Sequence, residues 1–447
     1  MTLFDRAGLI HLDRALARLE DGFGGLPPVD TPDDPRIAAV LEEVADRLRD
    51  NFPYPHPLYA GQMLKPPHAV ARLAYMLALS LNPNNHALDG GRASSRMERE
   101  AVATLATLLG WTEHLGHLTS GGTMANLEAL WVAGQCRPGE LIVASTQAHY
   151  THQRISAVLG LPFASVAADG AGRLDLDALR ALAARERIGT VVATLGTTAV
   201  GAVDPLPGLL ALQAEAGFRI HVDAAYGGYF GLVDNLAPPA RAAFDRIGAA
   251  DSVVIDPHKH GLQPYGCGAV LFRDPSVGRF YRHDSPYTYF SSAELHLGEI
   301  SLECSRAGAS AVALWATQRL LPPVPGGEFA ARLGRSRAAA LALHARLAAD
   351  PRVVAGLAPE LDIVVWAPRA AGVAAASARA RRLFEEAARH DLHLALAELA
   401  PDLVDPTRQL TRDRATLTCL RSVLMKPEHL EWLPALWERL DAATNAA

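Results

Sequence analysis

Cysteine is scarce in this chain of 447 residues, and the four that occur are widely dispersed: Cys136, Cys267, Cys304 and Cys419. None of them forms a C-x-x-C pair, so the spacing argues against a disulfide framework. We therefore expect free thiols, as is usual in a cytoplasmic protein. The chain also lacks an internal repeat of the length that is typical of solenoid proteins.

The sequence contains no apolar run long enough to cross a membrane. Its first residues, Met1-Thr-Leu-Phe-Asp-Arg, carry charges where a secretory signal needs an apolar stretch, so we expect no membrane association and a cytoplasmic location. There is no excess of basic charge either: the net charge is −6, which argues against a general nucleic-acid-binding protein. With 49% hydrophobic and 20% charged residues, the chain is typical of a large globular protein with a substantial core.

Two common cofactor signatures are also missing. The 17 histidines include short pairs such as His149-x-x-His152, but none forms the H-E-x-x-H pattern, so we expect no catalytic metal. Gly266-Cys-Gly268 stands alone and does not make a dinucleotide-binding fingerprint.

The most informative residue present is Lys259, in the segment Val253-Val-Ile-Asp-Pro-His-Lys-His. It follows an apolar strand, and a turn at the end of a strand directs a long charged side chain into a cleft. A second apolar strand, 219–223, ends in Asp223. A lysine amine that condenses with an aldehyde, together with a buried carboxylate that holds a pyridinium nitrogen, is the pair that a pyridoxal phosphate (PLP) enzyme requires.

Two further segments supply groups for such a cofactor. Ser120-Gly-Gly-Thr123 precedes a helical pattern, and small residues at a helix start expose backbone N–H groups to a phosphate. His149 follows the predicted strand 141–145, where its imidazole would stack on a cofactor ring.

In these segments the chain resembles the group II PLP-dependent amino acid decarboxylases, which include the aromatic amino acid, glutamate and histidine enzymes. The resemblance covers residues 50–320 and depends on six short segments: Ser120-to-Thr123, Ala148-His149, Thr194-Leu-Gly-Thr-Thr198, His221-Val-Asp223-Ala-Ala-Tyr226, Asp256-Pro-His258-Lys259 and Glu303-Cys-Ser-Arg306. It implies a PLP-dependent transferase-like fold of type I, in the α/β class. It further implies a mainly parallel seven-stranded sheet in the large domain, a small α+β C-terminal domain and a homodimer with its active site at the subunit interface.

The resemblance also implies roles for individual residues. Lys259, Asp223 and His149 would be catalytic, together with a tyrosine on a loop that returns a proton to the substrate carbon; Tyr289 fits better than Tyr287, and the choice stays open. Asp256 is left out of the site, because a carboxylate near a phosphate is unfavourable unless it is paired. The expected cofactor-binding residues are Ser120, Gly121, Gly122, Thr123, His149, Thr198, Asp223, Ala225, His258 and Lys259.

The expected reaction is α-decarboxylation of an L-amino acid to an amine and CO2. Arg306 is predicted to bind a substrate carboxylate, because a guanidinium suits bidentate recognition. Tyr59 and Gln62 would line the substrate pocket by their position relative to the family. An aromatic substrate is preferred to an acidic one, since no basic cluster awaits a second carboxylate. The alternatives are a carbon–carbon lyase of the same fold and a non-catalytic PLP-binding relative.

Three parts are predicted along the chain: an N-terminal arm (1–75) that packs on the partner subunit, a large PLP-binding domain (76–320) and a small C-terminal domain (321–447). Helical patterns alternate with apolar strands in the large domain, which predicts crossover connections and a mainly parallel sheet. The predicted strands are 141–145, 190–195, 219–223, 252–256 and 268–273, the last of them antiparallel after a short loop.

Overall fold

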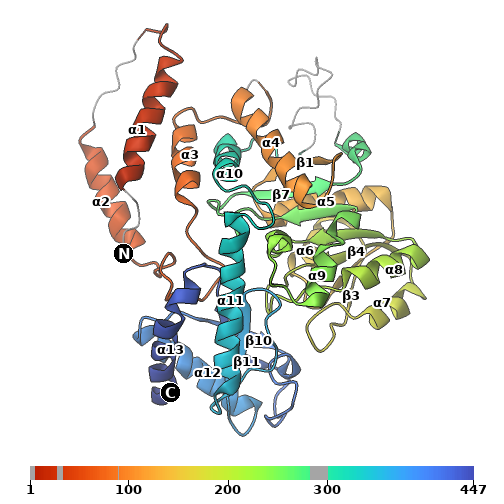
Figure 1. The fold of residues 1–447 in the computed structure, drawn as a ribbon. Coiled ribbons are helices and arrows are strands. Elements are labelled where there is room, and N and C mark those ends of the chain that lie inside the picture. The colour runs from red at the N-terminus through yellow and green to blue at the C-terminus, as the bar shows by residue number, and fades with distance from the viewer. Residues whose placement is uncertain (1–5, 28–33, 89, 282–300) are drawn as a thin grey trace.

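The computed structural model describes residues 6–27, 34–88, 90–281 and 301–447. Its first two helices, α1 (Arg6–Asp21) and α2 (Arg36–Leu48), lie at one edge of the molecule, with α1 nearer to the rest of the chain (Figure 1). Helix α1 packs against α3 (Ala69–Leu79), whereas α2 buries none of its residues against the described chain. This arm therefore has little core of its own.

A seven-stranded sheet forms the centre of the large domain, in the order β1-β7-β6-β5-β4-β2-β3. The pairs among β2 to β6 are parallel, and β7 runs antiparallel to both of its neighbours. The predicted mainly parallel sheet with an antiparallel last strand is confirmed. The strands are β1 (Leu115–Thr119), β2 (Leu141–Ser145), β3 (Phe163–Val166), β4 (Ile188–Thr194), β5 (Arg219–Asp223), β6 (Ser252–Ile255) and β7 (Gly268–Phe272).

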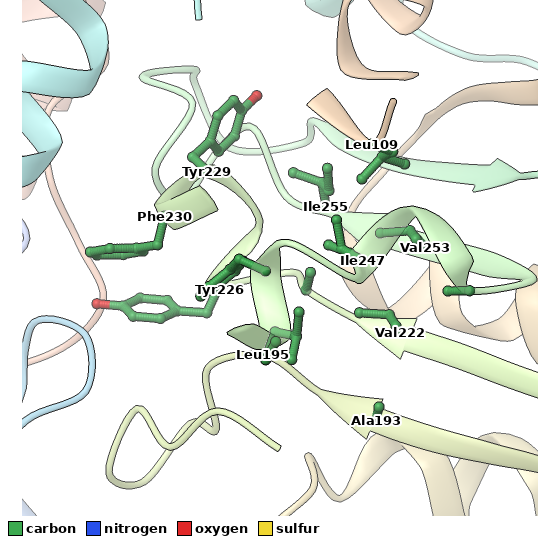
Figure 2. Packing of buried hydrophobic residues seen from close by; sticks show 14 of the residues in the cluster. Leu109, Ala193, Leu195, Val222, Tyr226, Tyr229, Phe230, Ile247, Val253 and Ile255 are labelled. Atoms are coloured by element: carbon green, nitrogen blue, oxygen red, sulfur yellow. The ribbon is translucent and has the colours of Figure 1, made fainter. Parts of the chain in front are cut away.

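Helices connect the parallel strands and cover the sheet. All seven residues of β4 are buried, as expected for a central strand covered on both faces. Figure 2 shows one layer of this core, in which Ala193, Val222, Val253 and Ile255 from neighbouring strands pack together. The helices of this domain are α4 (Arg92–Leu108), α5 (Gly122–Cys136), α6 (Thr151–Leu159), α7 (Leu176–Ala183), α8 (Leu206–Ala216), α9 (Pro238–Phe244) and α10 (Gly308–Leu320).

A four-stranded antiparallel sheet in the order β10-β11-β9-β8 forms the second, smaller domain. Its strands are β8 (Val353–Val354), β9 (Ile363–Pro368), β10 (Ala395–Leu399) and β11 (Leu417–Val423). Helices α11 (Glu328–Ala349), α12 (Val373–Arg389) and α13 (His429–Ala446) accompany it. No helix in the described ranges combines the length and the apolar character that crossing a bilayer demands.

Helix α11 joins the two domains (Figure 1). Phe329 and Leu333, near its start, belong to the core of the large sheet, whereas Leu343 and Leu347, near its end, belong to the core of the small domain. The segment after the arm helices also joins the small domain, because Leu58 is part of that second core. The boundaries at 75 and 320 stay predictions.

Candidate active site

The carboxyl ends of the parallel strands and the start of α5 enclose a cavity of about 290 Å³. Crossover connections bring these strand ends to one edge of the sheet, which is where α/β proteins bind ligands. Ten of the wall residues are the predicted cofactor-binding set: Ser120, Gly121, Gly122, Thr123, His149, Thr198, Asp223, Ala225, His258 and Lys259. The chain thus brings together residues that are up to 139 positions apart, counted from Ser120 to Lys259.

Lys259 follows β6 in a tight turn, as the sequence predicts, and its side chain is 22% exposed. Its Nζ lies 3.2 Å from Oδ2 of Asp256, a residue that the sequence analysis left out of the site. Asp256 in fact lines the cavity, and His258 Nε2 lies 3.4 Å from the same oxygen. The pairing with Lys259 explains how a carboxylate is tolerated there, and it corrects the earlier exclusion.

Asp223 lies at the end of β5 and is held by a buried network. His152 Nε2 lies 2.9 Å from Oδ2, Asn126 Nδ2 donates to the same oxygen at 3.3 Å, and the backbone N–H of Ala225 donates to Oδ1 at 3.1 Å. Burial alone would raise the pKa of Asp223, but the hydrogen bond and charge of His152 and the charge of Lys259 hold this pKa below its usual value. The carboxylate is therefore kept ionised.

His152 and Asn126 are functional candidates that sequence reasoning missed. His152 follows His149 by three positions at the start of α6, a spacing that places both side chains near one helix end. Asn126 lies four positions after Gly122 on α5, and its Oδ1 lies 2.8 Å from His221 Nε2. A search for polar residues one helical turn beyond each predicted site residue would have found both.

The predicted phosphate cradle, Ser120 to Thr123, leads into the first turn of α5. Close packing requires glycine there, since a Cβ on Gly122 would lie 2.6 Å from Asp256 Oδ2. Gly268 on β7 also allows the close approach of the turn, because a Cβ added at this position would lie 2.6 Å from the carbonyl carbon of Gly121. The N–H of Ser120 already donates to Glu303 Oε2 at 2.9 Å.

Two histidines, His149 and His258, line the cavity. His149 Nδ1 lies 2.8 Å from Thr151 Oγ1, and burial lowers the pKa of His149. Burial also lowers the pKa of His258, whose ring packs against Tyr265 with the centroids 4.7 Å apart. Both rings are therefore largely neutral at pH 7, which suits stacking and hydrogen bonding better than charge pairing.

Thr198 follows β4, and its carbonyl oxygen accepts a hydrogen bond from Arg421 Nη2 at 2.7 Å. Arg421, on β11 of the small domain, also donates to the carbonyl of Ala199. Sequence reasoning missed this arginine because nothing local connects the two domains.

Three predicted residues that the structure describes, Arg306, Tyr59 and Gln62, do not line the cavity. Arg306 donates to Glu98 Oε1 at 2.6 Å and to the carbonyls of Leu118 and Asn85, so its buried guanidinium has a structural role in place of the expected substrate contact. Tyr59 is buried beside the small domain, and its hydroxyl accepts from the N–H of the exposed Gln62. Tyr289, like Tyr287, lies outside the described residues.

Comparison with known proteins supports the interpretation of this cavity as a pyridoxal phosphate site. A family model described as the pyridoxal-dependent decarboxylase conserved domain matches residues 138–353. The L-aspartate decarboxylase of Thermococcus kodakarensis is 31% identical over 288 residues, which are 62% of this chain and 71% of that protein. The chain belongs to the pyridoxal-dependent decarboxylase family.

Other members differ in substrate and length. The L-tyrosine decarboxylase of Enterococcus faecium is 29% identical over 387 residues, and the match covers 63% of this chain and 63% of that enzyme, which is less than two thirds of it. The structure of Oryza sativa TDC with PLP and tryptamine superimposes with a TM-score of 0.78 at 20% identity, covering 96% of this chain and 91% of that one. That likeness shows the same fold.

The residues of the cavity fit the cofactor of this family. Asp256 Oδ1, His258 Nδ1 and Thr194 Oγ1 are buried polar atoms without a hydrogen-bond partner in the described chain, so the wall presents groups for a polar ligand. Gly121 and Gly122 place backbone without side chains at the cavity wall, and Lys259 supplies the amine. No group of three or more metal-ligating side chains occurs within the described ranges.

Proposed function

We propose that this protein uses PLP to remove the α-carboxyl group of an L-amino acid as CO2, leaving the amine. One observation carries the proposal: the amine of Lys259 and the ionised carboxylate of Asp223 line the same cavity at the start of α5. This pairing is typical of PLP enzymes, and the family to which the chain belongs is named for the decarboxylation.

Each of the ten predicted cofactor-binding residues receives a role in this proposal. Lys259 Nζ would hold the cofactor aldehyde covalently, Ser120 to Thr123 would bind its phosphate, and Asp223 would stay charged beside its ring nitrogen. His149 would stack on the ring, while Thr198, Ala225 and His258 would complete the wall. When bound, PLP withdraws the electrons of the bond that breaks, which is the part of the chemistry that no side chain supplies.

The remaining task of the protein is proton movement. Release of CO2 breaks the bond between Cα and the carboxyl carbon and leaves an electron pair that must take up one proton at Cα. Tyr289, or Tyr287, is proposed as the donor, and Lys259 Nζ is a second candidate because it lies in the cavity. The network of His152 and Asn126 would keep the Asp223 carboxylate in position throughout.

The proposed substrate is an aromatic L-amino acid. Lys259 is the only Lys or Arg among the residues that line the described cavity, so the described wall offers no spare cation for a second carboxylate. The relatives include an L-tyrosine decarboxylase and an L-aspartate decarboxylase, so aromatic and acidic amino acids are the two substrate classes to compare. Arg306, Tyr59 and Gln62 do not line this cavity in the described chain, so the proposal gives them no substrate contact.

We also propose a homodimer and a cytoplasmic location. The support for the dimer is the apolar surface of α2, where Ile37, Val40, Leu41 and Leu48 are 56 to 61% exposed. The free thiols are consistent with a reducing compartment.

The decisive experiment combines cofactor trapping with an amino acid screen. The chain has only three lysines, Lys65, Lys259 and Lys426, so borohydride reduction followed by peptide mapping assigns the linkage unambiguously. We expect the label on Lys259, and CO2 release from aromatic L-amino acids that disappears in Lys259→Arg. A label elsewhere contradicts the proposal. A label on Lys259 with aldehyde release but no CO2 would favour the carbon–carbon lyase.

A further inference from the structure

A second cavity, of about 200 Å³, lies between the start of α3, helix α11 and the segment that precedes α13. It shares no lining residue with the first cavity. Its volume is more than ten times the roughly 15 Å³ that one water molecule needs, so it has room for a small ligand. Nothing in the proposed decarboxylation uses it.

Lysine is rare in this protein, and the second cavity holds two of the three. The chain has 42 Lys and Arg residues, of which only Lys65, Lys259 and Lys426 are lysines. Lys65 and Lys426 both line the second cavity, and apart from Lys259 every other Lys or Arg position of the chain is arginine. A compact ammonium group suits a confined site, where the planar guanidinium fork needs more room.

Lys426 is buried: only 2% of the residue is exposed. Its Nζ donates to the carbonyl oxygen of Tyr59 at 2.6 Å. Lys65 Nζ lies 3.4 Å from Nδ1 of His260. Within the ranges that the structure describes, neither lysine has a carboxylate at ion-pair distance, and a buried charge without such a partner is costly.

The wall of the cavity is positively charged. Four cations line it, Lys65, Arg72, Arg332 and Lys426, against one carboxylate, Glu428. Arg332 is paired with Glu328 at 2.9 Å. The first residue of α3, Ala69, also lines the cavity, so the positive end of that helix dipole adds to the field.

The pKa values of the two lysines are lowered, as expected for an anion-binding site without its anion. Burial lowers the pKa of Lys65 to about 8. Burial, and then the charge of Lys65, lowers the pKa of Lys426 to about 7. Each ammonium is therefore destabilised where it stands, and a bound anion would restore both pKa values.

We propose that this cavity binds a small oxyanion with at least two negative charges, of the phosphate or dicarboxylate type, through Lys65 and Lys426. Arg72 and Arg332 form the remainder of the cationic wall. The site also borders the active site: Lys65 contacts His260, the residue after Lys259, and the His260 ring packs edge-on against Tyr226, with the centroids 4.7 Å apart. Tyr226 in turn lines the first cavity, so the two sites share a wall.

The test is isothermal titration calorimetry of the PLP-saturated protein with inorganic phosphate and, separately, with succinate. We expect one site per chain for at least one of the two anions, and an affinity at least about tenfold weaker in Lys426→Met and in Lys65→Met. Lys65 is the less buried of the two, so its variant guards against a folding defect in the other. Arg335→Gln is the matched control, because Arg335 lies on α11 in an ion pair with Glu431 outside the cavity.

A second control separates this site from the cofactor cavity. Thr123→Ala alters the proposed phosphate cradle and should leave the measured affinity unchanged. If binding disappears in Thr123→Ala and persists in the lysine variants, or if neither anion binds, the proposal is overturned. Because the measurement needs no turnover, a wrong assignment of the reaction would not affect it.

Binding should also take up protons, since both lysines are partly neutral near pH 8 in the free protein. Affinity is expected to fall as the pH rises from 7 to 9, and calorimetry in two buffers with different ionisation enthalpies measures the uptake. The other charged or titratable groups around the two lysines are Glu328, Glu428, Asp362, Arg72, Arg332, His56, Tyr59, His68, His260 and His429. No proton uptake together with unchanged affinity over this range would contradict the role of the lysines.

Discussion

At the scale of single residues, the site depends on keeping one buried carboxylate charged. Asp223 is 6% exposed, and burial by itself favours the neutral acid. The hydrogen bond and charge of His152, together with the charge of Lys259, reverse that preference, and Asn126 donates a further hydrogen bond to the same oxygen. The role assigned to Asp223 therefore depends in part on His152, which is not in the family motif quoted from the sequence.

His152→Leu should impair catalysis without preventing cofactor binding. Loss of a hydrogen bond to a charged group costs about 1.5–3 kcal/mol, which corresponds to a fall in kcat of roughly 10- to 100-fold if the full effect appears in the reaction. Steady-state CO2 release measures it, and His152→Gln, which retains a donor, should recover part of the loss. His344→Gln, remote from the cavity, is the control. Equal activity in His152→Leu and the wild type would show that Asp223 needs no such support.

The buried position of His429 should make the stability of the protein depend on pH. Burial lowers its pKa to about 3, whereas an unfolded histidine titrates near 6.5. The folded form therefore binds fewer protons between these values, so this contribution is fully present above pH 6.5 and is lost as the pH falls towards 3. In urea unfolding between pH 6 and 5, His429→Gln should lose about 1 kcal/mol per pH unit less than the wild type. Parallel pH profiles would contradict this.

At the scale of elements, the start of α5 is fixed by contacts rather than by helix propensity. Its N-cap position is Gly121, which has no side chain to cap the helix, and the turn packs directly on Asp256 and on β7. The strand ends therefore determine where the backbone N–H groups of the cradle point.

Gly122→Ala tests that packing. The new Cβ would lie 2.6 Å from Asp256 Oδ2, and Asp256 is held in turn by Lys259, so we expect the cradle to shift and the affinity for PLP to fall by about tenfold or more. Fluorescence titration of the apoprotein with PLP measures it. Gly170→Ala is the matched control, because a Cβ there meets nothing within 4 Å. Unchanged affinity in Gly122→Ala would mean that the turn adapts freely.

At the scale of the whole molecule, the two domains are packed against each other, whereas the N-terminal arm leaves apolar side chains exposed. Helix α11 contributes to both cores, which ties the domains together, while α2 leaves its apolar side exposed. Single apolar residues on a surface are normal, but a helix with several of them is typical of a contact surface.

Leu41→Glu should therefore convert a dimer to a monomer. Leu41 is 60% exposed, so the change costs the isolated chain little and acts mainly on an interface. Size-exclusion chromatography with light scattering gives the mass, and Glu42→Lys, on the same helix, is the control. A wild-type monomer, or a Leu41→Glu dimer, would contradict the proposed dimer.

The sequence by itself determined the sheet class and ten residues of the cavity. These features can be recognised within short segments. They are an apolar strand that ends in Asp223, an apolar strand followed by Lys259, and a turn of small residues before a helix. It did not identify β1 or β3 as strands, because such short segments are recognised through their partners in the sheet. Only the tertiary structure decided the places of Asp256, His152 and Arg306, since burial and ion pairing depend on contacts between distant segments. The same is true of the second cavity, where Lys65 and Lys426 are 361 positions apart and acquire a shared environment only in the folded chain.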